Sequence, residues 1–441
     1  MRLSLTIALL LISGLAEAAI KSYFNNREGV SYMDPYRQVM RSGDDLEAVI
    51  LQEIEGARST IFLAVQEIRL PNVAKKLVEK YRQGLDVRIV LENSYNHNVL
   101  AQPDAPEGED PDSHDSTRFR DLVALVDMNN DGKITRAEML ERDAVFILQQ
   151  AKLPMIDDTE DGSIGSGLMH HKFMVIDGKR VLLSSANFTP SCVHGDVLAA
   201  RSRGNANGLM TVGSVPLAKI FAEEFDHMWS ARFGMKKPFR GARTVSVGGK
   251  KITVQFSPST RNVDWSMTTN GLIAKTLTAA KTSIEASLFV FSEQKLADAM
   301  KKAAHRADIE VLVERKFAYR SYSEVLDLLG VELPDARCVI EPGNAPWRPA
   351  IEKAGVTTLA NGDVLHHKFG VVDQRKVIFG SHNWSDAANA INDEFLVVVD
   401  DTSTASEFSL EHQRLAKRAQ WGVTTRINQE IERMSEFCSP L

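Results

Sequence analysis

The chain has 441 residues, of which 44% are hydrophobic and 25% charged, with 52 Lys and Arg against 58 Asp and Glu. This composition excludes a disordered chain, a collagen-like repeat and a membrane protein with many spans. The length predicts two to three domains or one large duplicated unit. The formal net charge is -6, but residues 101–160 hold fifteen acids and six bases. The rest of the chain is slightly basic, so net charge does not exclude a polyanionic substrate.

The first eighteen residues have the pattern of a secretory signal peptide. Arg2 precedes an apolar run from Leu3 to Leu15, and Ala16-Glu17-Ala18 fits a cleavage site with small residues. A single membrane anchor is the alternative, but the run is short for a span. We therefore predict a secreted or periplasmic protein that begins near Ala19. Such a compartment permits disulfides, although the odd set of three cysteines leaves at least one unpaired and the pairing open: Cys192, Cys338 and Cys438.

The same succession of strand-like and helix-like segments occurs twice. The first copy has an alternating run at 20–25, then a helix at 46–55, a strand at 60–65, a helix at 73–83, a strand at 87–91 and a last helix at 221–229. The second copy has its counterparts at 252–257, 272–280, 283–291, 296–305, 310–313 and 407–421. This alternation predicts an α/β/α sandwich in each half. We place the first repeat at 19–240 and the second at 241–441, joined around 236–249.

Both halves contain a histidine–lysine hairpin with the same spacing. Each hairpin has a His-x-Lys strand, an Asp at the turn and a Ser-x-Asn return strand. The first copy supplies His170, Lys172, Asp177, Ser185 and Asn187, and the second His366, Lys368, Asp373, Ser381 and Asn383. Because side chains alternate along a strand, the His and Lys of each copy share one face, and the returning Ser and Asn lie beside them.

These side chains suit the binding and attack of a phosphate group. Lysine and asparagine donate hydrogen bonds to non-bridging oxygens, and two copies supply two positive charges for the transition state. One imidazole can attack phosphorus while the other protonates the leaving oxygen. Two structural hairpins with core histidines are the alternative, but the matched positions at the same spacing in both copies make that alternative improbable.

The paired motifs resemble the HxKxxxxD and GSxN signature of the phospholipase D superfamily. The resemblance implies a duplicated α/β/α sandwich, with two halves about a pseudo-two-fold axis, one shared active site, a phosphohistidine intermediate and no metal in the chemistry. It makes His170 and His366 catalytic and assigns phosphate binding to the two lysines and to Ser185, Ser381, Asn187 and Asn383. Asp177 and Asp373 complete the candidate set, with a role in ordering the hairpins. Ser184 stands where the superfamily usually has glycine.

The superfamily often has a downstream carboxylate that hydrogen-bonds the histidine. Glu394 supplies it in the second half, whereas the matching position of the first half is Asn207. A carboxylate partner favours imidazolium, which a general acid must be. This asymmetry favours His366 as the acid and His170 as the nucleophile, although Asp196 is an alternative carboxylate for the first half.

The first half contains an insertion of roughly 27 residues relative to the second, and a calcium loop of the EF-hand type lies within it. Lys133, at the seventh position, supplies a backbone carbonyl. Side-chain oxygens at the other ligand positions come from Asp127, Asn129, Asp131, Thr135 and Glu138. Helices are predicted at 117–126 and 136–149, so residues 115–150 are predicted to form an EF-hand-like insertion. Residues 102–115 are predicted to form a flexible loop. We expect Ca²⁺ to be structural or regulatory. A solvated acidic turn is the alternative.

The sequence therefore predicts an exported phosphodiesterase that hydrolyses phospholipid headgroup esters and works as a monomer, with contact to a membrane surface. A secreted nuclease acting on nucleic acid is the second hypothesis, although no Lys/Arg stripe with interleaved aromatics is present. A phosphatidyltransferase is the third hypothesis. A non-catalytic, calcium-dependent adhesion protein is the fourth, and the two intact signatures argue against it.

Overall fold

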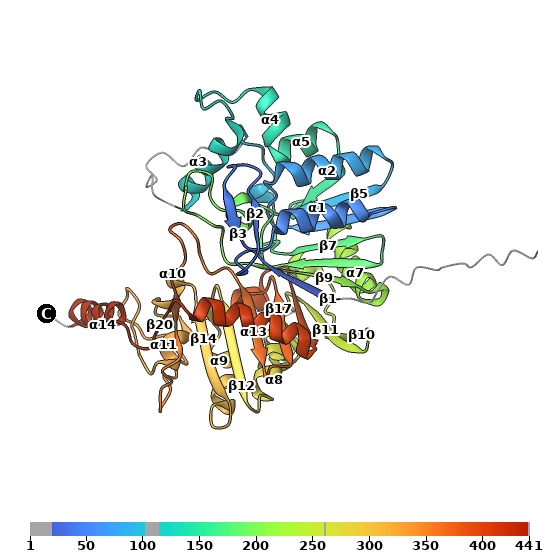
Figure 1. Cartoon of the computed structure of the whole chain (residues 1–441). Coiled ribbons are helices and arrows are strands. Elements are labelled where there is room, and N and C mark those ends of the chain that lie inside the picture. Colours follow the sequence, from blue (N-terminus) through green and yellow to red (C-terminus); the bar gives the residue numbers. More distant parts are fainter. Residues whose placement is uncertain (1–19, 102–113, 260–261, 440–441) are drawn as a thin grey trace, which may run out of the picture.

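A computed structural model describes residues 20–101, 114–259 and 262–439 (Figure 1). The predicted signal peptide and most of the predicted flexible loop lie outside these residues. Two large sheets run through two lobes. The first sheet has the order β1 (Ile20–Phe24), β9 (Gly208–Gly213), β8 (Arg180–Ser184), β7 (Lys172–Ile176), β4 (Thr60–Val65), β5 (Asp86–Leu91) and β6 (Met155–Asp157). The second has the order β10 (Arg243–Val247), β11 (Lys250–Ser257), β19 (Glu394–Asp400), β17 (Lys376–Gly380), β16 (Lys368–Val372), β12 (Ser283–Leu288), β14 (Asp308–Val313), β15 (Ala354–Thr357) and β20 (Ala419–Trp421).

The strand orders confirm the duplication. The order from β1 to β6 is repeated from β11 to β15, with the same mixture of parallel and antiparallel neighbours. The second sheet adds β10 at one edge and β20 at the other. The fold is therefore the predicted mixed α/β architecture with two related halves.

Helices cover both faces of each sheet. The outer layer consists of α1 (Leu46–Gly56) and α2 (Pro71–Arg82) in the first half, and α8 (Thr269–Thr278) and α9 (Gln294–Ala303) in the second. The inner layer consists of α7 (Val215–Trp229) and α13 (Thr402–Ala416). One hydrophobic cluster contains Phe221 of α7, Phe408 of α13, and Phe173 and Phe395 from the two sheets. The two halves thus share one core, whose burial from water holds them together.

The hairpins β7–β8 and β16–β17 turn through residues at positive φ, namely Asp177 and Gly178 in the first and Asp373 and Gln374 in the second. A two-residue hairpin turn of this hand requires positive φ at both central positions, which Asp and Gly tolerate. The carboxylate of Asp177 accepts hydrogen bonds from the backbone of Arg58, Ser59 and Thr60. The turn therefore fixes the start of β4.

The remaining elements lie outside these layers or connect them. They are the helices α3 (His114–Val126), α4 (Arg136–Arg142), α5 (Ala144–Gln150), α6 (Pro190–Val193), α10 (Arg315–Ala318), α11 (Glu324–Leu328), α12 (Asp386–Ala390) and α14 (Thr425–Cys438), the strands β2 (Ser31–Met33), β3 (Met40–Ser42), β13 (Phe291–Ser292) and β18 (Trp384–Ser385), and 3-10 turns at Asn93–Tyr95, Gly234–Lys236 and Trp265–Met267.

Several predicted boundaries were wrong, and α7 begins at Val215 instead of at 221. The helix predicted at 136–149 is interrupted, because the Asp143 side chain caps α5 through Phe146 N and also accepts from Val99 N. The helix predicted at 407–421 ends at Ala416, and the following residues form β20 against β15. The strand predicted at 283–291 ends at Leu288, and Phe291 pairs separately with Trp384.

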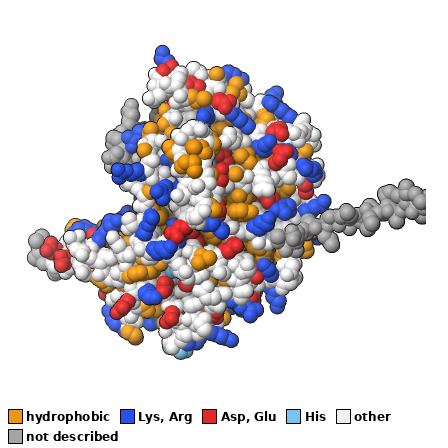
Figure 2. All heavy atoms as spheres, viewed as in Figure 1, with side chains coloured by type: hydrophobic (Ala, Val, Ile, Leu, Met, Phe, Trp, Pro, Cys, Tyr) orange, Lys and Arg blue, Asp and Glu red, His pale blue; other side chains and the backbone are white. Residues whose placement is uncertain are grey.

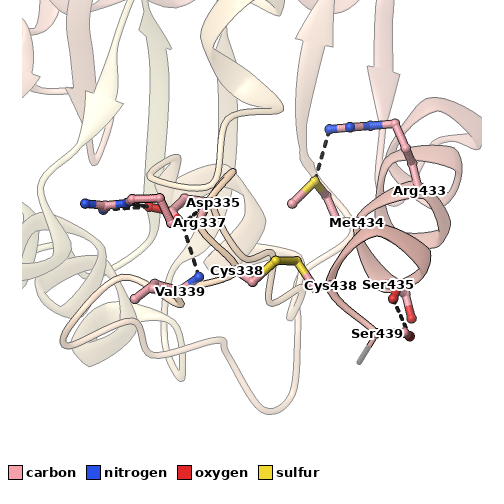
Figure 3. Close-up of a disulfide and its surroundings, with 9 residues drawn as sticks. All are labelled: Asp335, Arg337, Cys338, Val339, Arg433, Met434, Ser435, Cys438 and Ser439. Carbon is pink, nitrogen blue, oxygen red and sulfur yellow. Dashed lines mark hydrogen bonds and ion pairs between the residues drawn. A yellow bond between two sulfur atoms is a disulfide. The ribbon is translucent and has the colours of Figure 1, made fainter. Parts of the chain in front are cut away.

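Cys338 and Cys438 form a disulfide that ties the loop after α11 to the end of α14 (Figure 3). Cys192 is free and buried. The pairing that the sequence left open is thus between residues 100 positions apart. Within the described part of the chain, no helix is both long and apolar enough to cross a membrane.

Candidate active site

His170 and His366 lie just before β7 and β16, where the two halves exchange backbone contacts. His170 N donates to Asp393 O at 3.0 Å, and His366 N donates to Ala206 O at 3.0 Å. Isolated bridges pair Met169 with Asp393 and Leu365 with Ala206. Each histidine is therefore held in place by the opposite half of the chain.

The side-chain partners are crossed in the same way. Nδ1 of His170 lies 2.7 Å from Glu394 of the second half, and Nδ1 of His366 lies 2.9 Å from Asn207 Oδ1 of the first half. We had expected Glu394 to serve the histidine of its own half, and that expectation was wrong. Strand β19 carries Glu394 across the pseudo-two-fold axis, and Asn207 precedes β9 in the equivalent place. Asp196, the alternative carboxylate for the first half, is not needed, because Glu394 occupies His170 Nδ1 and Asn207 occupies His366 Nδ1.

The environment of Asn207 sets the tautomer of His366. Its Nδ2 donates to the carbonyls of Cys192 and Asn205 at 3.0 and 3.1 Å, which requires the amide oxygen to point at His366. That oxygen can only accept, so His366 Nδ1 carries the proton. Glu394 imposes the same tautomer on His170 whenever its carboxylate is ionised. Both neutral imidazoles therefore have an unprotonated Nε2.

Lys172 and Lys368 are fully buried beside the histidines. Lys172 Nζ donates to His170 O at 2.9 Å and to Gln66 Oε1 at 3.2 Å. Lys368 Nζ donates to His366 O at 2.7 Å and lies 4.7 Å from the centre of the Phe289 ring. The ammonium groups thus lie on the strand face that the histidines share, as the alternation along a strand predicts.

Burial governs the charge of this site. It lowers the pKa of Lys172 to about 8 and the pKa of Lys368 well below its usual value, in the second case aided by repulsion from Lys172. Burial, followed by repulsion from the two lysines, also holds the pKa of each of His170 and His366 well below 6.5. The pKa of Glu394 is raised by burial. A site that disfavours its own positive charges gains most from the arrival of an anion.

The predicted hydroxyl and amide residues lie next to the histidines and their hydrogen-bond partners. Ser185 Oγ donates to Asn207 Oδ1, and Ser381 Oγ accepts from Phe395 N, so both serines order the backbone around the histidine partners. Ser184 caps the same turn through Ala186 N. Asn187 and Asn383, at equivalent positions, each have a buried Oδ1 with no partner among the described residues. Their predicted contact with phosphate stays a prediction.

Asp177 and Asp373 do not belong to the site. Asp373 accepts from the backbone of Lys281, Thr282 and Ser283, as Asp177 does at the equivalent turn. Both turns are at the far end of the β7 and β16 strands from the histidines. Their place among the catalytic candidates was therefore wrong, whereas the hairpin-ordering role predicted for them agrees with these hydrogen bonds.

The second histidine of each motif faces the shared core. His171 Nε2 is 2.9 Å from Glu224 of α7, and His367 Nε2 is 2.9 Å from Glu411 of α13, with all four side chains buried. Lys237 links Glu224 to Asp393, at 2.5 and 2.6 Å. These histidine–glutamate hydrogen bonds, together with the ion pairs of Lys237, fix the inner helices against the strands that carry the site.

Sequence reasoning missed the residues that follow β4 and β12. Gln66 N donates to His171 O and Phe289 N to His367 O, so the two positions are equivalent. In the first half, the side-chain amide of Gln66 accepts a hydrogen bond from Lys172. In the second half, the ring of Phe289 lies against Lys368, and its centre is 4.7 Å from that of the His366 ring. Glu67 next to Gln66 pairs with Arg118, which belongs to the insertion. Aligning the two copies position by position could have found this difference.

In the predicted calcium loop, Gly132 adopts positive φ and Asp127 accepts from the backbone N–H groups of Asp131 and Gly132. Glu138 accepts from Met128 N and Thr135 N, at opposite ends of the loop. Within the described residues, no three His, Cys, Asp or Glu side chains are arranged to hold a metal ion. The donor set still consists of oxygens, which is what Ca²⁺ selects.

A family model described as "Cardiolipin synthase, PLD-like domain" matches residues 50–229 and 273–416. The mitochondrial cardiolipin hydrolases of Mus musculus and Xenopus laevis are 27% and 30% identical over 145 and 141 residues, each match covering 32% of this chain. These matches cover 56% and 57% of the two relatives, so the chain spans little more than half of their length. The crystal structure of phosphatidylserine synthase from Haemophilus influenzae is 11% identical, with a TM-score of 0.56, over 94% of this chain and 91% of that one.

Two repeats that share one histidine–lysine site define a phospholipase D-like protein. The family match covers well over half of the chain, and the chain therefore belongs to the family of PLD-like domains. The relatives named above are described as mitochondrial cardiolipin hydrolases. The phosphatidylserine synthase likeness shows the fold alone.

The lowered pKa of Lys172 predicts an alkaline limit to activity. Because the pKa is depressed to about 8, the ammonium is charged below that pH and loses its proton above it. We expect kcat/KM on bis-p-nitrophenyl phosphate to fall as pH rises through about 8. The pH at which kcat itself falls should be higher, because a bound phosphodiester anion favours the charged form of the lysines. A kcat/KM that stays constant to pH 10 would contradict this assignment.

Proposed function

We propose that the protein is a phosphodiesterase that hydrolyses phospholipid headgroup esters through a phosphohistidine at His170. The observation that carries the proposal is the crossed site, in which two imidazoles with free Nε2 atoms flank two buried lysines. The choice of a phospholipid is supported by the cardiolipin hydrolases among the relatives and by the description of the family.

In the first step, Nε2 of His170 attacks phosphorus and the bond to the leaving alcohol breaks. His366, protonated once the phosphodiester anion is bound, gives its Nε2 proton to the leaving oxygen. Lys172 and Lys368 neutralise charge on the non-bridging oxygens as the transition state forms. In the second step, His366 takes a proton from water, the oxygen attacks phosphorus, and the bond to His170 breaks. Phosphatidate and the free alcohol are the products.

The crossed pairs support this division of roles for a reason other than the one derived from the sequence. The nucleophile carries a positive ring for the whole life of the phosphohistidine, and Glu394 stabilises that charge on His170. The acid must release its proton, which an amide partner retains less strongly than a carboxylate does. Asn207 therefore suits His366 as the acid.

Purified protein should release headgroup from phosphatidylglycerol and cardiolipin in detergent micelles and should cleave bis-p-nitrophenyl phosphate. His170→Ala and His366→Ala should each lower kcat by at least about 10³, because attack and protonation are separate tasks. Turnover of plasmid DNA with no turnover of any phospholipid would make the protein a nuclease and overturn the proposal.

The same variants assign the roles. A rapid quench of His366→Ala in alkaline detergent, in which the P–N bond of phosphohistidine is stable, should leave label from phosphate-labelled substrate on the peptide that contains His170, and His170→Ala should leave none. Asp373→Asn is a matched control: it should lower stability with little change in kcat. Label on the His366 peptide in His170→Ala, and none in His366→Ala, would reverse the two roles.

We also propose that the loop from Asp127 to Glu138 binds Ca²⁺. Its support is the oxygen ligand set in the EF-hand order and the positive φ of Gly132. Binding requires the Glu138 carboxylate to exchange its hydrogen bonds to Met128 and Thr135 for the ion. The ion would order the insertion, and the phosphoryl chemistry is assigned to the histidines and lysines.

Calcium should raise the melting temperature, by the equivalent of about 2.7 kcal/mol at a hundredfold excess over the dissociation constant. Glu138→Gln should remove this rise, whereas Glu141→Gln on the same helix, whose partner is Lys75, should not. Turnover of a soluble diester in excess chelator should persist at a temperature where the protein is folded. Complete loss of that turnover, restored by calcium, would place the ion in the catalytic site.

We further propose that the protein is exported. The proposal is supported by the pattern of residues 1–18 and by the disulfide between Cys338 and Cys438, since disulfides persist in oxidising compartments. Mass spectrometry of the native protein should find an N-terminus near Ala19 and one free thiol. A cytoplasmic protein with an intact Met1 and three thiols would exclude export.

A further inference from the structure

The residues that follow β4 and β12 lie in equivalent places beside the two lysines. Gln66 N donates to His171 O at 3.0 Å, and Phe289 N donates to His367 O at 2.7 Å. Each contact joins the end of a strand to the second histidine of the neighbouring motif, so the backbone is duplicated here as it is in the sheets. The two halves therefore differ at this position through their side chains.

The amide of Gln66 uses its oxygen within the protein and keeps its nitrogen available. Lys172 Nζ donates to Gln66 Oε1 at 3.2 Å. An ammonium has hydrogens but no lone pair, so the amide must turn its oxygen to Lys172 and its NH₂ group elsewhere. Among the described residues, none accepts a hydrogen bond from Gln66 Nε2, although the residue is only 7% exposed. An amide donor in so enclosed a place is expected to bind solvent or a ligand.

Gln66 is held between the strand of the lysine and the turn of the motif asparagine. Its carbonyl accepts from Glu92 N at 3.3 Å, and the carbonyl of the next residue, Glu67, accepts from Phe188 N at 3.0 Å. Phe188 directly follows Asn187, which is predicted to contact phosphate. The backbone at this amide is thus anchored on both sides, next to the lysine that the proposed reaction assigns to a non-bridging oxygen.

The second half has no side-chain donor at this position. The Phe289 ring lies against Lys368 and His366, and it packs edge-on against Phe317 of α10, with 4.8 Å between the ring centres. A phenyl ring offers no N–H or O–H group, whereas the lysine and the asparagine of each motif have a counterpart in the other half. A phosphodiester held between the two lysines would therefore have a further donor beside one non-bridging oxygen and an aromatic ring beside the other.

A site on a pseudo-two-fold axis could accept a phosphodiester in two orientations. Figure 2 shows Lys and Arg side chains interspersed with Asp and Glu side chains along the boundary between the two lobes. The charge on this face is mixed, so side chains inside the site must decide the orientation of a bound anion.

We propose that Gln66 is a substrate-binding residue: its Nε2 donates to the non-bridging oxygen that Lys172 binds, and this contact fixes the orientation of the phosphodiester. This role rests on the proposed phosphodiesterase reaction. A neutral amide adds a donor without adding a positive charge, which burial in this site disfavours. Charge on the bound oxygen grows as the transition state forms, so the contact is strongest there.

The test uses the two isomers at phosphorus of methyl p-nitrophenyl phosphorothioate, which in a fixed orientation place sulfur in different non-bridging positions. Sulfur accepts hydrogen bonds weakly, so the isomer with sulfur beside Gln66 should react more slowly. Wild-type protein should cleave the other isomer at least about tenfold faster. Gln66→Met has no amide, so it should bring the ratio of the two rates to within about twofold of one. It should also lower kcat on bis-p-nitrophenyl phosphate by roughly 10².

Gln66→Glu separates substrate binding from support of Lys172. Its carboxylate still accepts from the lysine but has no N–H group, so the preference between the isomers should be lost here too. Phe289→Gln should also lower the preference, because it adds a donor beside the second oxygen. Gln255→Met is the matched control: the buried Gln255 side chain donates to Met267 O in the second half, and its loss should leave the ratio unchanged.

Equal rates for the two isomers with the wild-type protein would overturn the role of Gln66. A preference that survives in Gln66→Glu would reduce Gln66 to a support for Lys172 and would exclude substrate binding, even if Gln66→Met fails to fold. In both cases the diester is still cleaved, so the proposed function stands. If the wild-type protein cleaves neither methyl p-nitrophenyl phosphate nor any phospholipid in detergent micelles, the proposed function fails and the role of Gln66 fails with it.

Discussion

The structure depends on an exchange of partners across its pseudo-two-fold axis. The imidazole of each half is hydrogen-bonded by a side chain of the other half, and the backbone N–H of each histidine is bound there as well. Neither repeat can complete its own histidine. The shared aromatic cluster and the ion pairs of Lys237 with Glu224 and Asp393 hold the halves in the register that this exchange requires. A small shift between the halves would break both histidine contacts together.

Burial of the lysines and histidines sets the charge of the site that this exchange assembles. Two lysines and two histidines lie close together in a site that excludes water, and burial lowers the pKa of each. In the proposed reaction, a phosphodiester anion supplies the negative charge that this arrangement lacks, so substrate binding and protonation of the acid occur together. The second histidine of each motif has a separate task, because His171 and His367 pair with Glu224 and Glu411 on the core side of the strands.

The two halves have a duplicated backbone but differ in a few side chains at the site. Glu394 faces Asn207 across the axis, and Gln66 occupies the position that Phe289 has in the other half. The insertion adds to the difference, since Arg118 of α3 pairs with Glu67 beside Gln66. These differences give the two histidines different electrostatic surroundings while the backbone remains duplicated.

Local patterns in the sequence determined the repeat, the strands and the shared face of His170 with Lys172 and of His366 with Lys368, because strand alternation and hairpin turns depend on neighbouring residues alone. Even the hairpin role of Asp177 followed from its place at the turn. Tertiary structure decided the rest: that Glu394 serves His170, that Asp143 divides a helix, that Cys338 joins Cys438, and that Gln66 and Phe289 touch the lysines. These contacts join residues far apart in the chain or depend on a buried neighbour. The packing of the two halves brings such residues together, and the local spacing of residues in the sequence does not predict these contacts.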